Sequence, residues 1–233
     1  MRRNIINILT VALAVTVSYL YTPLSAQETS RWAIGLQSGY TSTTISRYDA
    51  GRMDERYSSL GGFEATLQAR YTFNPWLAVR ANLGFMQRSH RMDRNLNYLD
   101  QVYTEHINRY LMLPVVADFS FGGERMRGHM LAGAYAGYWL GEHRRGTTYW
   151  MTDYYVYFEP FDEERELTEN DIRPVAGFVA GAALTYPIGS RFEIGAEALY
   201  YYDATSHHKG YEHLADPRYL NTLSLTLNIN YKL

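Results

Sequence analysis

Eleven consecutive residues alternate strictly between apolar and polar side chains: Phe63-Glu64-Ala65-Thr66-Leu67-Gln68-Ala69-Arg70-Tyr71-Thr72-Phe73. Successive side chains of a β-strand point to opposite faces, so a strand separates the two sets completely, whereas a helix would mix them. Asn74-Pro75 follows directly, and this pair favours a turn. The segment therefore predicts a β-strand with one apolar face, one polar face and a tight turn at its end.

The same alternation recurs through the rest of the chain. It is clear at residues 77–85, 192–202 and 222–233, and weaker at 32–40, 107–121, 128–141 and 174–186. Together with 63–73 these segments make eight strands. Each is about long enough to cross a bilayer at a tilt, which takes roughly 9–11 residues.

The connections between these segments alternate in length. Tight turns near 74–75, 122–125 and 187–190 separate long polar links near 43–60, 89–104, 142–172 and 205–217. Short turns at one end and long loops at the other are typical of up-and-down outer-membrane barrels. The sequence thus predicts an all-β fold, an eight-stranded antiparallel up-and-down transmembrane β-barrel, in the outer membrane of a Gram-negative bacterium.

The start of the chain has the pattern of an export signal. Arg2 and Arg3 precede an apolar run at 5–20, and Ala26 offers a small residue for cleavage. We therefore expect a cleaved signal peptide at residues 1–26 and one barrel domain at 27–233.

The composition agrees with a membrane barrel. The chain has 22 tyrosines among 233 residues, and aromatic rings gather at the girdles of membrane barrels. It has no cysteine, which excludes disulfides and thiol chemistry, and its net charge of −2 offers no basic surface for nucleic acid. The expected partners are outer-membrane lipid, lipopolysaccharide and the barrel assembly machinery, and no cofactor is expected.

Three further segments carry a family resemblance: Arg109-Tyr110-Leu111-Met112-Leu113-Pro114-Val115-Val116-Ala117-Asp118-Phe119, Val175-Ala176-Gly177-Phe178-Val179-Ala180-Gly181-Ala182-Ala183-Leu184 and Arg191-Phe192-Glu193-Ile194-Gly195-Ala196-Glu197-Ala198-Leu199-Tyr200-Tyr201. They resemble, in order, the "Tyr-Leu-x-Ile-Pro" strand, the glycine-rich sixth strand and the "x-Glu-Ala-Arg-Tyr" strand of the PorT-like outer-membrane β-barrel family of Bacteroidota. The resemblance implies the fold and the location. The named member of that family takes part in protein secretion, but that role is not carried over, and a secretion or surface-assembly machine stays one alternative setting for this chain.

Six charged residues fall on the polar face that should line the lumen: Glu64, Arg70, Arg80, Asp118, Glu193 and Glu197. The interior of an eight-stranded barrel is just wide enough for side chains to fill it, and an unpaired buried charge costs several kcal/mol. We therefore predict a salt-bridged polar network that fills the lumen. An ion or proton path is the sharper alternative, and a wide diffusion pore is disfavoured.

Six histidines map near the long links: His90, His106, His143, His207, His208 and His213. With Asp203 and Ser206, His207 and His208 supply the residue types of a lipid-modifying enzyme, such as a hydrolase acting on the acyl chains of lipid A. The last three histidines are also zinc-ligand candidates. Neither set has a defining spacing, so the main prediction is no enzymatic activity and no metal.

The link at 142–172 combines aromatic and acidic side chains. Its aromatic residues form a predicted interaction surface: Trp150, Tyr154, Tyr155, Tyr157, Phe158 and Phe161. Its carboxylates could hold Ca²⁺, although their spacing matches no known loop: Asp162, Glu163, Glu164, Glu166, Glu169 and Asp171. A plain solvated loop is the simplest alternative, and a hairpin that extends the barrel wall above the membrane is another.

The sequence therefore favours an integral outer-membrane barrel with a structural or interaction role through its extracellular loops. Two alternatives stay open. One is a lipid-modifying outer-membrane enzyme, and the other is a secreted, soluble, lipocalin-like barrel that binds an apolar ligand.

Overall fold

The computed structural model of the protein describes residues 31–47, 55–94, 102–123, 125–152, 155–169, 171–206 and 218–233. The predicted signal peptide at 1–26 lies outside these residues. No helix in these ranges is long and apolar enough to cross a membrane. The strands are β1 (Trp32–Arg47), β2 (Glu55–Asn74), β3 (Leu77–Arg94), β4 (Tyr103–Gly122), β5 (Arg127–Met151), β6 (Val156–Arg165), β7 (Pro174–Ile188), β8 (Phe192–Asp203) and β9 (Arg218–Lys232).

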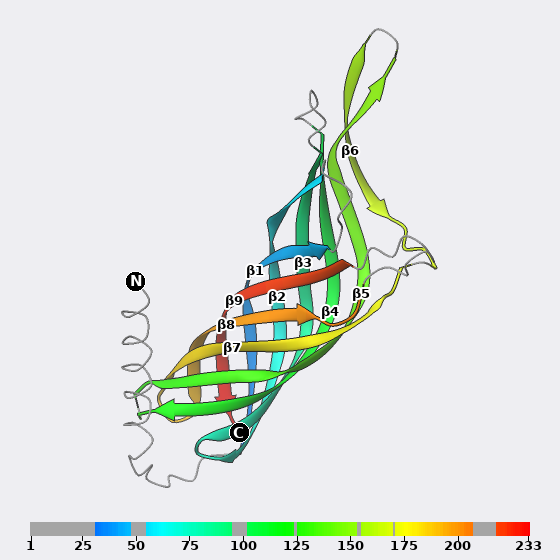
Figure 1. The fold of residues 1–233 in the computed structure, drawn as a ribbon. Helices are drawn as coiled ribbons and strands as arrows, with labels where there is room; N and C mark the ends of the chain where they lie inside the picture. The colour runs from blue at the N-terminus through cyan, green and yellow to red at the C-terminus, as the bar shows by residue number, and fades with distance from the viewer. Residues whose placement is uncertain are drawn as a thin grey trace, which may run out of the picture.

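Eight of the nine strands close into an antiparallel barrel (Figure 1). β1 pairs with both β2 and β9, and β4 pairs with β5. β5 also pairs with β7, so β6 is not part of the barrel wall. The predicted eight-stranded up-and-down barrel is therefore confirmed. Closure gives every barrel strand two neighbours, which is what a sheet needs in order to satisfy its backbone polar groups in lipid.

The ninth strand, β6, makes the predicted long link at 142–172 a hairpin with the outer part of β5, which is the alternative of a hairpin that extends the barrel wall. Residues 142–151 of β5 pair with β6, and residues 127–138 pair with β7. Figure 1 shows the hairpin of β5 and β6 rising beyond the barrel. Its alternation was hidden in the sequence because charged and aromatic residues occupy both of its faces.

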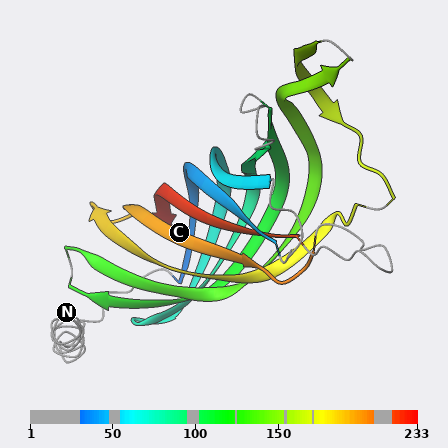
Figure 2. The same cartoon turned by 45° about the horizontal axis from the view of Figure 1, so that its top comes forward.

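Two of the other outer links are also shorter than predicted, because β1, β2, β3 and β4 run on beyond the predicted strand ends, whereas the link between β8 and β9 spans 204–217, close to the prediction. Only residues 48–54 separate β1 from β2, and 95–102 separate β3 from β4. The outer parts of β3, β4 and β5 rise on one side of the barrel (Figure 2). The result is a curved sheet that stands above the barrel and ends in the β5–β6 hairpin.

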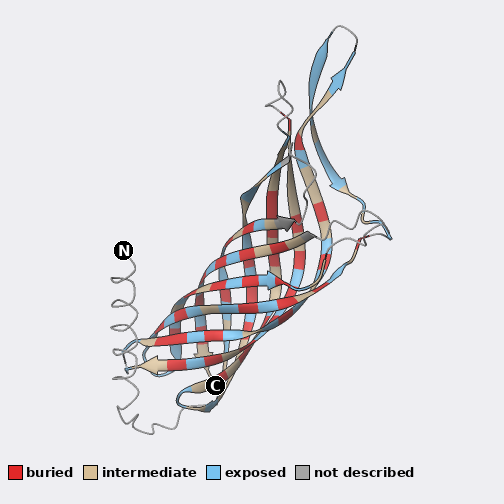
Figure 3. Ribbon diagram, in the orientation of Figure 1, coloured by how far each residue is buried: buried red, intermediate tan, exposed pale blue. Residues whose placement is uncertain are grey.

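The two faces of the wall separate as the alternation predicts (Figure 3). On β1, the side chain of Leu36 is 60% exposed, whereas its neighbour Gln37 is 3% exposed. The same inside–outside alternation is seen on β4 and β9. The apolar face therefore points outward, toward lipid. This orientation is the reverse of what a lipocalin-like barrel needs to hold an apolar ligand inside.

Aromatic rings border this apolar band at both ends. At the end with the tight turns, Trp32 lies 4.8 Å from Tyr71 between ring centroids. Toward the other end, Phe63 lies 5.2 Å from Phe85 and is paired in register with Tyr40. Trp32 and Tyr40 are 40 − 32 = 8 residues apart on β1, or about 26 Å along the strand. At a strand tilt of roughly 35–45°, this spacing spans roughly 20 Å along the barrel axis, slightly less than the apolar band of about 25 Å that membrane barrels show.

Candidate functional site

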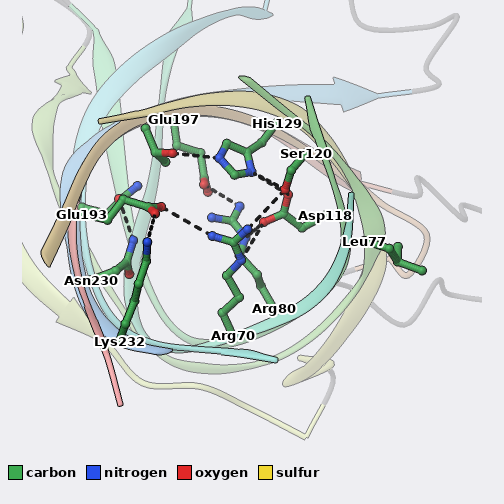
Figure 4. A network of polar contacts seen from close by, with 12 residues as sticks. Arg70, Leu77, Arg80, Asp118, Ser120, His129, Glu193, Glu197, Asn230 and Lys232 are labelled. Atoms are coloured by element: carbon green, nitrogen blue, oxygen red, sulfur yellow. Dashed lines mark hydrogen bonds and ion pairs between the residues drawn. The ribbon is translucent and has the colours of Figure 1, made fainter. Parts of the chain in front are cut away.

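Five of the six predicted lumen charges meet at the end of the barrel with the tight turns (Figure 4). Arg80 lies 2.5 Å from Glu197 and 3.6 Å from Asp118. Arg70 lies 3.4 Å from both Asp118 and Glu193. The two arginines from β2 and β3 thus pair with three carboxylates from β4 and β8. Each charge has an opposite charge at hand, as burial in a narrow lumen requires.

Glu64, the sixth predicted residue, is buried on the inner face of β2 but stands apart from this network. It makes no ion pair within the described part of the chain. Lys232, which the prediction did not include, lies 3.5 Å from Glu193.

His129 on β5 completes the network and was missed in the sequence. Its Nδ1 lies 2.7 Å from Asp118 and 3.3 Å from the Ser120 hydroxyl, and its Nε2 lies 2.9 Å from the Thr185 hydroxyl. The segment around it is rich in glycine and alanine, which weakened the alternation. The sequence could still have placed His129 in the lumen, because His129 and Leu131 are alternate residues of one strand and alternate residues share a face. The side chain of Leu131 is also buried.

A second buried cluster lies farther along the lumen, around Arg88. The guanidinium lies 2.7 Å from Asp203 and donates hydrogen bonds to the Thr222 hydroxyl and the Leu220 carbonyl. Asp203 also accepts a hydrogen bond from the Tyr135 hydroxyl. Asp203, the acid of the enzyme alternative, is therefore engaged inside the barrel, while His207, His208 and His213 lie outside the described residues.

Apolar side chains fill the space around Arg88. The residues of this cluster are buried on the inner faces of β3, β4, β5, β7, β8 and β9: Met86, Tyr110, Met112, Val116, Leu131, Tyr135, Trp139, Val175, Val179, Ala183, Leu199, Tyr201 and Leu220. The lumen thus holds a polar network at one end and a packed core beyond it. This packing leaves the barrel filled with side chains, in agreement with its small strand number.

Glu142 on β5 lies at the outer mouth of the lumen, above the membrane band, where it is the centre of a group of ion pairs. Its carboxylate lies 2.6 Å from His106 and 2.8 Å from both Arg144 and Arg165. Burial raises the pKa of Glu142, but the hydrogen bonds from His106 and Arg144 outweigh burial and hold the pKa well below its usual range. Arg165 also binds Asp171 at 2.8 Å, which fastens the segment after β6 to the mouth.

The predicted aromatic surface lies on the β5–β6 hairpin. Trp150, Tyr155 and Tyr157 are 64%, 67% and 57% exposed, Phe158 is less so, and Phe161 is half-buried. Tyr154 lies outside the described residues. The rings do not form one patch, because Phe158 faces the side of the hairpin opposite Tyr157.

Three of the six predicted carboxylates of this link, Asp162, Glu164 and Asp171, are in ion pairs. Asp162 lies 2.9 Å from His143, and Glu164 contacts Arg109. Within the described ranges, no group of three or more His, Asp or Glu side chains is arranged to hold a metal ion.

These features define a class of protein. A closed antiparallel barrel with an outward apolar band, aromatic borders and a filled lumen is an integral outer-membrane β-barrel. The chain belongs to the outer membrane protein beta-barrel domain family, whose model matches residues 25–202. The narrower resemblance to PorT-like barrels stays a prediction.

The chain is similar to solved structures of outer membrane proteins at low sequence identity. OprG from Pseudomonas aeruginosa is 10% identical with a TM-score of 0.51, and the match covers 88% of this chain and 97% of OprG. Ail, the attachment invasion locus protein of Yersinia pestis, is 16% identical with a TM-score of 0.40, and the match covers 87% of this chain and 99% of Ail. Neisserial surface protein A is 12% identical with a TM-score of 0.46, covering 89% and 100%. No curated protein sequence matches the chain.

Proposed function

We propose that this protein is a non-conducting outer-membrane barrel that displays the β5–β6 hairpin as a binding element on the cell surface. The observation that carries this proposal is the exposure of apolar side chains along the hairpin: Trp150, Met151, Tyr155, Val156, Tyr157 and Phe158. These residues lie beyond the aromatic border of the membrane band, so lipid does not cover them.

Hairpin energetics support the same conclusion. A two-stranded hairpin is marginally stable in water unless another layer covers an apolar face. The outer part of this hairpin, from Thr148 to Glu159, pairs only with itself in the described chain. On one face of the hairpin, Trp150 is opposite Tyr157 in register, and the ring of Tyr157 lies 6.2 Å from that of Tyr155. An exposed group of aromatic side chains of this kind favours an interaction site. We infer that the partner is a component at the cell surface, such as a part of a secretion or surface-assembly machine.

The filled lumen supports the non-conducting part of the proposal. Arg80, Asp118 and Glu197 occupy one end, and Arg88 with its apolar surroundings occupies the other. Purified protein in a planar bilayer is therefore expected to produce no discrete current steps. Regular single-channel steps would contradict this part.

The binding part is tested by photo-cross-linking in living cells of the native host. A photoreactive residue in place of Tyr157 is expected to give one discrete adduct, which the further change Trp150→Ser abolishes. A photoreactive residue in place of Asp93, elsewhere on the extracellular sheet, is the matched control. The same adduct from both positions, or an adduct that survives Trp150→Ser, would count against the hairpin.

A further inference from the structure

The two faces of the β5–β6 hairpin differ in how their carboxylates are used. On one face, Asp162 lies 2.9 Å from His143, and Glu164 contacts Arg109 and lies 3.4 Å from His143. The carboxylates on this face are therefore already engaged by side chains of β4 and β5.

The opposite face is continuous with Glu142 and Arg165 and is called here the lumen-side face. Register pairs Trp150 with Tyr157, so both lie on it. Alternate residues of β6 then extend the face as Tyr157, Glu159, Phe161 and Glu163. The strand thus presents aromatic and acidic side chains in alternation along a single face.

The carboxylates of this face are open to a partner. Glu163 is exposed and makes no ion pair in the described part of the chain, because Arg144, opposite it in register, turns to Glu142 at 2.8 Å. Glu159 is also exposed and accepts a hydrogen bond from the Trp150 indole at 2.8 Å, which orients that ring.

We propose that the lumen-side face of the hairpin binds a cationic, extended polypeptide segment. This inference rests on the proposed function and names the chemistry of its partner. Glu159 and Glu163 are four residues apart, or about 13 Å along the strand. That distance equals the spacing of basic side chains at positions i and i+4 of an extended peptide. An apolar side chain at i+2 then falls over Phe161.

The charge pattern favours this partner over others. Lysine and arginine pair with carboxylates and also stack on tyrosine and tryptophan rings, so both residue types of the face contribute to the same contact. An anionic glycan or lipid phosphate would instead meet Glu159 and Glu163 with like charge.

The free edge of β6 is a poorer docking site than this face. Pro160 lies opposite Thr147 within an unbroken register. Because proline has no N–H to donate, a strand added to this edge would lose a ladder hydrogen bond at its centre. The partner is therefore expected to lie across the side chains of β6 rather than to extend the sheet.

The test uses the mature protein in nanodiscs of zwitterionic phosphatidylcholine and a fluorescent peptide of repeated Lys-Ser-Leu-Ser units. Fluorescence anisotropy is expected to show saturable binding that weakens as salt rises. The double variant Glu159→Gln/Glu163→Gln should weaken binding by at least about tenfold, because it removes two charge-assisted contacts. Peptides of Glu-Ser-Leu-Ser or Lys-Ser-Ser-Ser units should bind at least about tenfold more weakly.

A matched control variant is Asp162→Asn/Glu164→Gln, which removes the same formal charge from the other face of β6. It should leave the affinity within about twofold, and the gel shift on boiling should be unchanged in both double variants. Equal weakening by both variants, or equal binding of the acidic peptide, overturns the proposal. So does a dimer cross-linked hairpin to hairpin, since a second copy would then be the occupant. If the cationic peptide fails but Trp150→Ser still abolishes the cellular adduct, the hairpin remains a binding element and only the cationic partner is wrong.

Discussion

The buried pair of Arg88 and Asp203 offers the sharpest test of how the lumen is stabilised. Both side chains are 0% exposed and 2.7 Å apart. Asp203→Asn keeps the size of the side chain but leaves the guanidinium with neutral acceptors alone, which are the introduced amide oxygen and the oxygens of Thr222 and Leu220. Arg88→Met leaves the carboxylate with the Tyr135 hydroxyl and the Leu220 amide. Each single change is expected to lower the free energy of unfolding by about 3–5 kcal/mol, because it strands a buried charge.

The double variant Arg88→Met/Asp203→Asn is expected to lose no more than either single variant. Removal of both charges leaves none unpaired, so the coupling energy should be about 3 kcal/mol or more. Denaturant unfolding in detergent micelles, followed by tryptophan fluorescence, measures all four proteins. Arg91→Met is the control, because Arg91 and its partner Asp93 are both 37% exposed and the change should cost less than about 1 kcal/mol. Additive losses in the double variant would refute the claim that the pair acts as a unit.

Three further predictions concern the mouth, the wall and the hairpin. Ionised Glu142 stabilises the fold at neutral pH because its folded pKa lies below its ordinary value. Glu142→Gln should therefore cost roughly 3 kcal/mol near pH 7, and the difference from the native chain should shrink as pH falls below about 4.5 in denaturant titrations. Gly133→Ala should cost about 1–3 kcal/mol, since its Cβ would lie 2.0 Å from the Val115 carbonyl oxygen, whereas Gly123→Ala meets nothing within 4 Å and should be neutral in the same assay. Trp150→Ser should change the free energy of unfolding by less than about 0.5 kcal/mol, because the indole is exposed, and boiled and unboiled gel mobility should match the native chain.

Strand alternation was enough to predict the barrel and the inward direction of its charges. Arg80, Asp118 and Glu197 were assigned to the lumen by parity alone, and the structure buries all three. Extending the same parity from Arg80 along β3 would also have found Arg88. The alternation of apolar and polar residues therefore predicts much of the fold, because a strand has only two faces.

The pairing inside the lumen could not be predicted. Arg70 and Glu193 are 123 residues apart, and their contact depends on the height at which each strand crosses the barrel. The alternation along a strand determines which face a residue takes. The stagger between strands determines the height of that residue along the barrel axis. The hairpin of β5 and β6 was only one alternative in the sequence, because both faces of β6 carry polar and aromatic residues and no single-faced alternation remains.

The absence of cysteine from the chain makes surface labelling the most direct test of the account's central claim, a membrane barrel with its hairpin outside. Trp150→Cys and Ser190→Cys place single thiols on the hairpin and on the tight turn between β7 and β8. A membrane-impermeant maleimide is expected to label the first variant on intact cells and the second only after the outer membrane is permeabilised. Labelling of the turn but not the hairpin on intact cells, or equal labelling of both, would contradict the account.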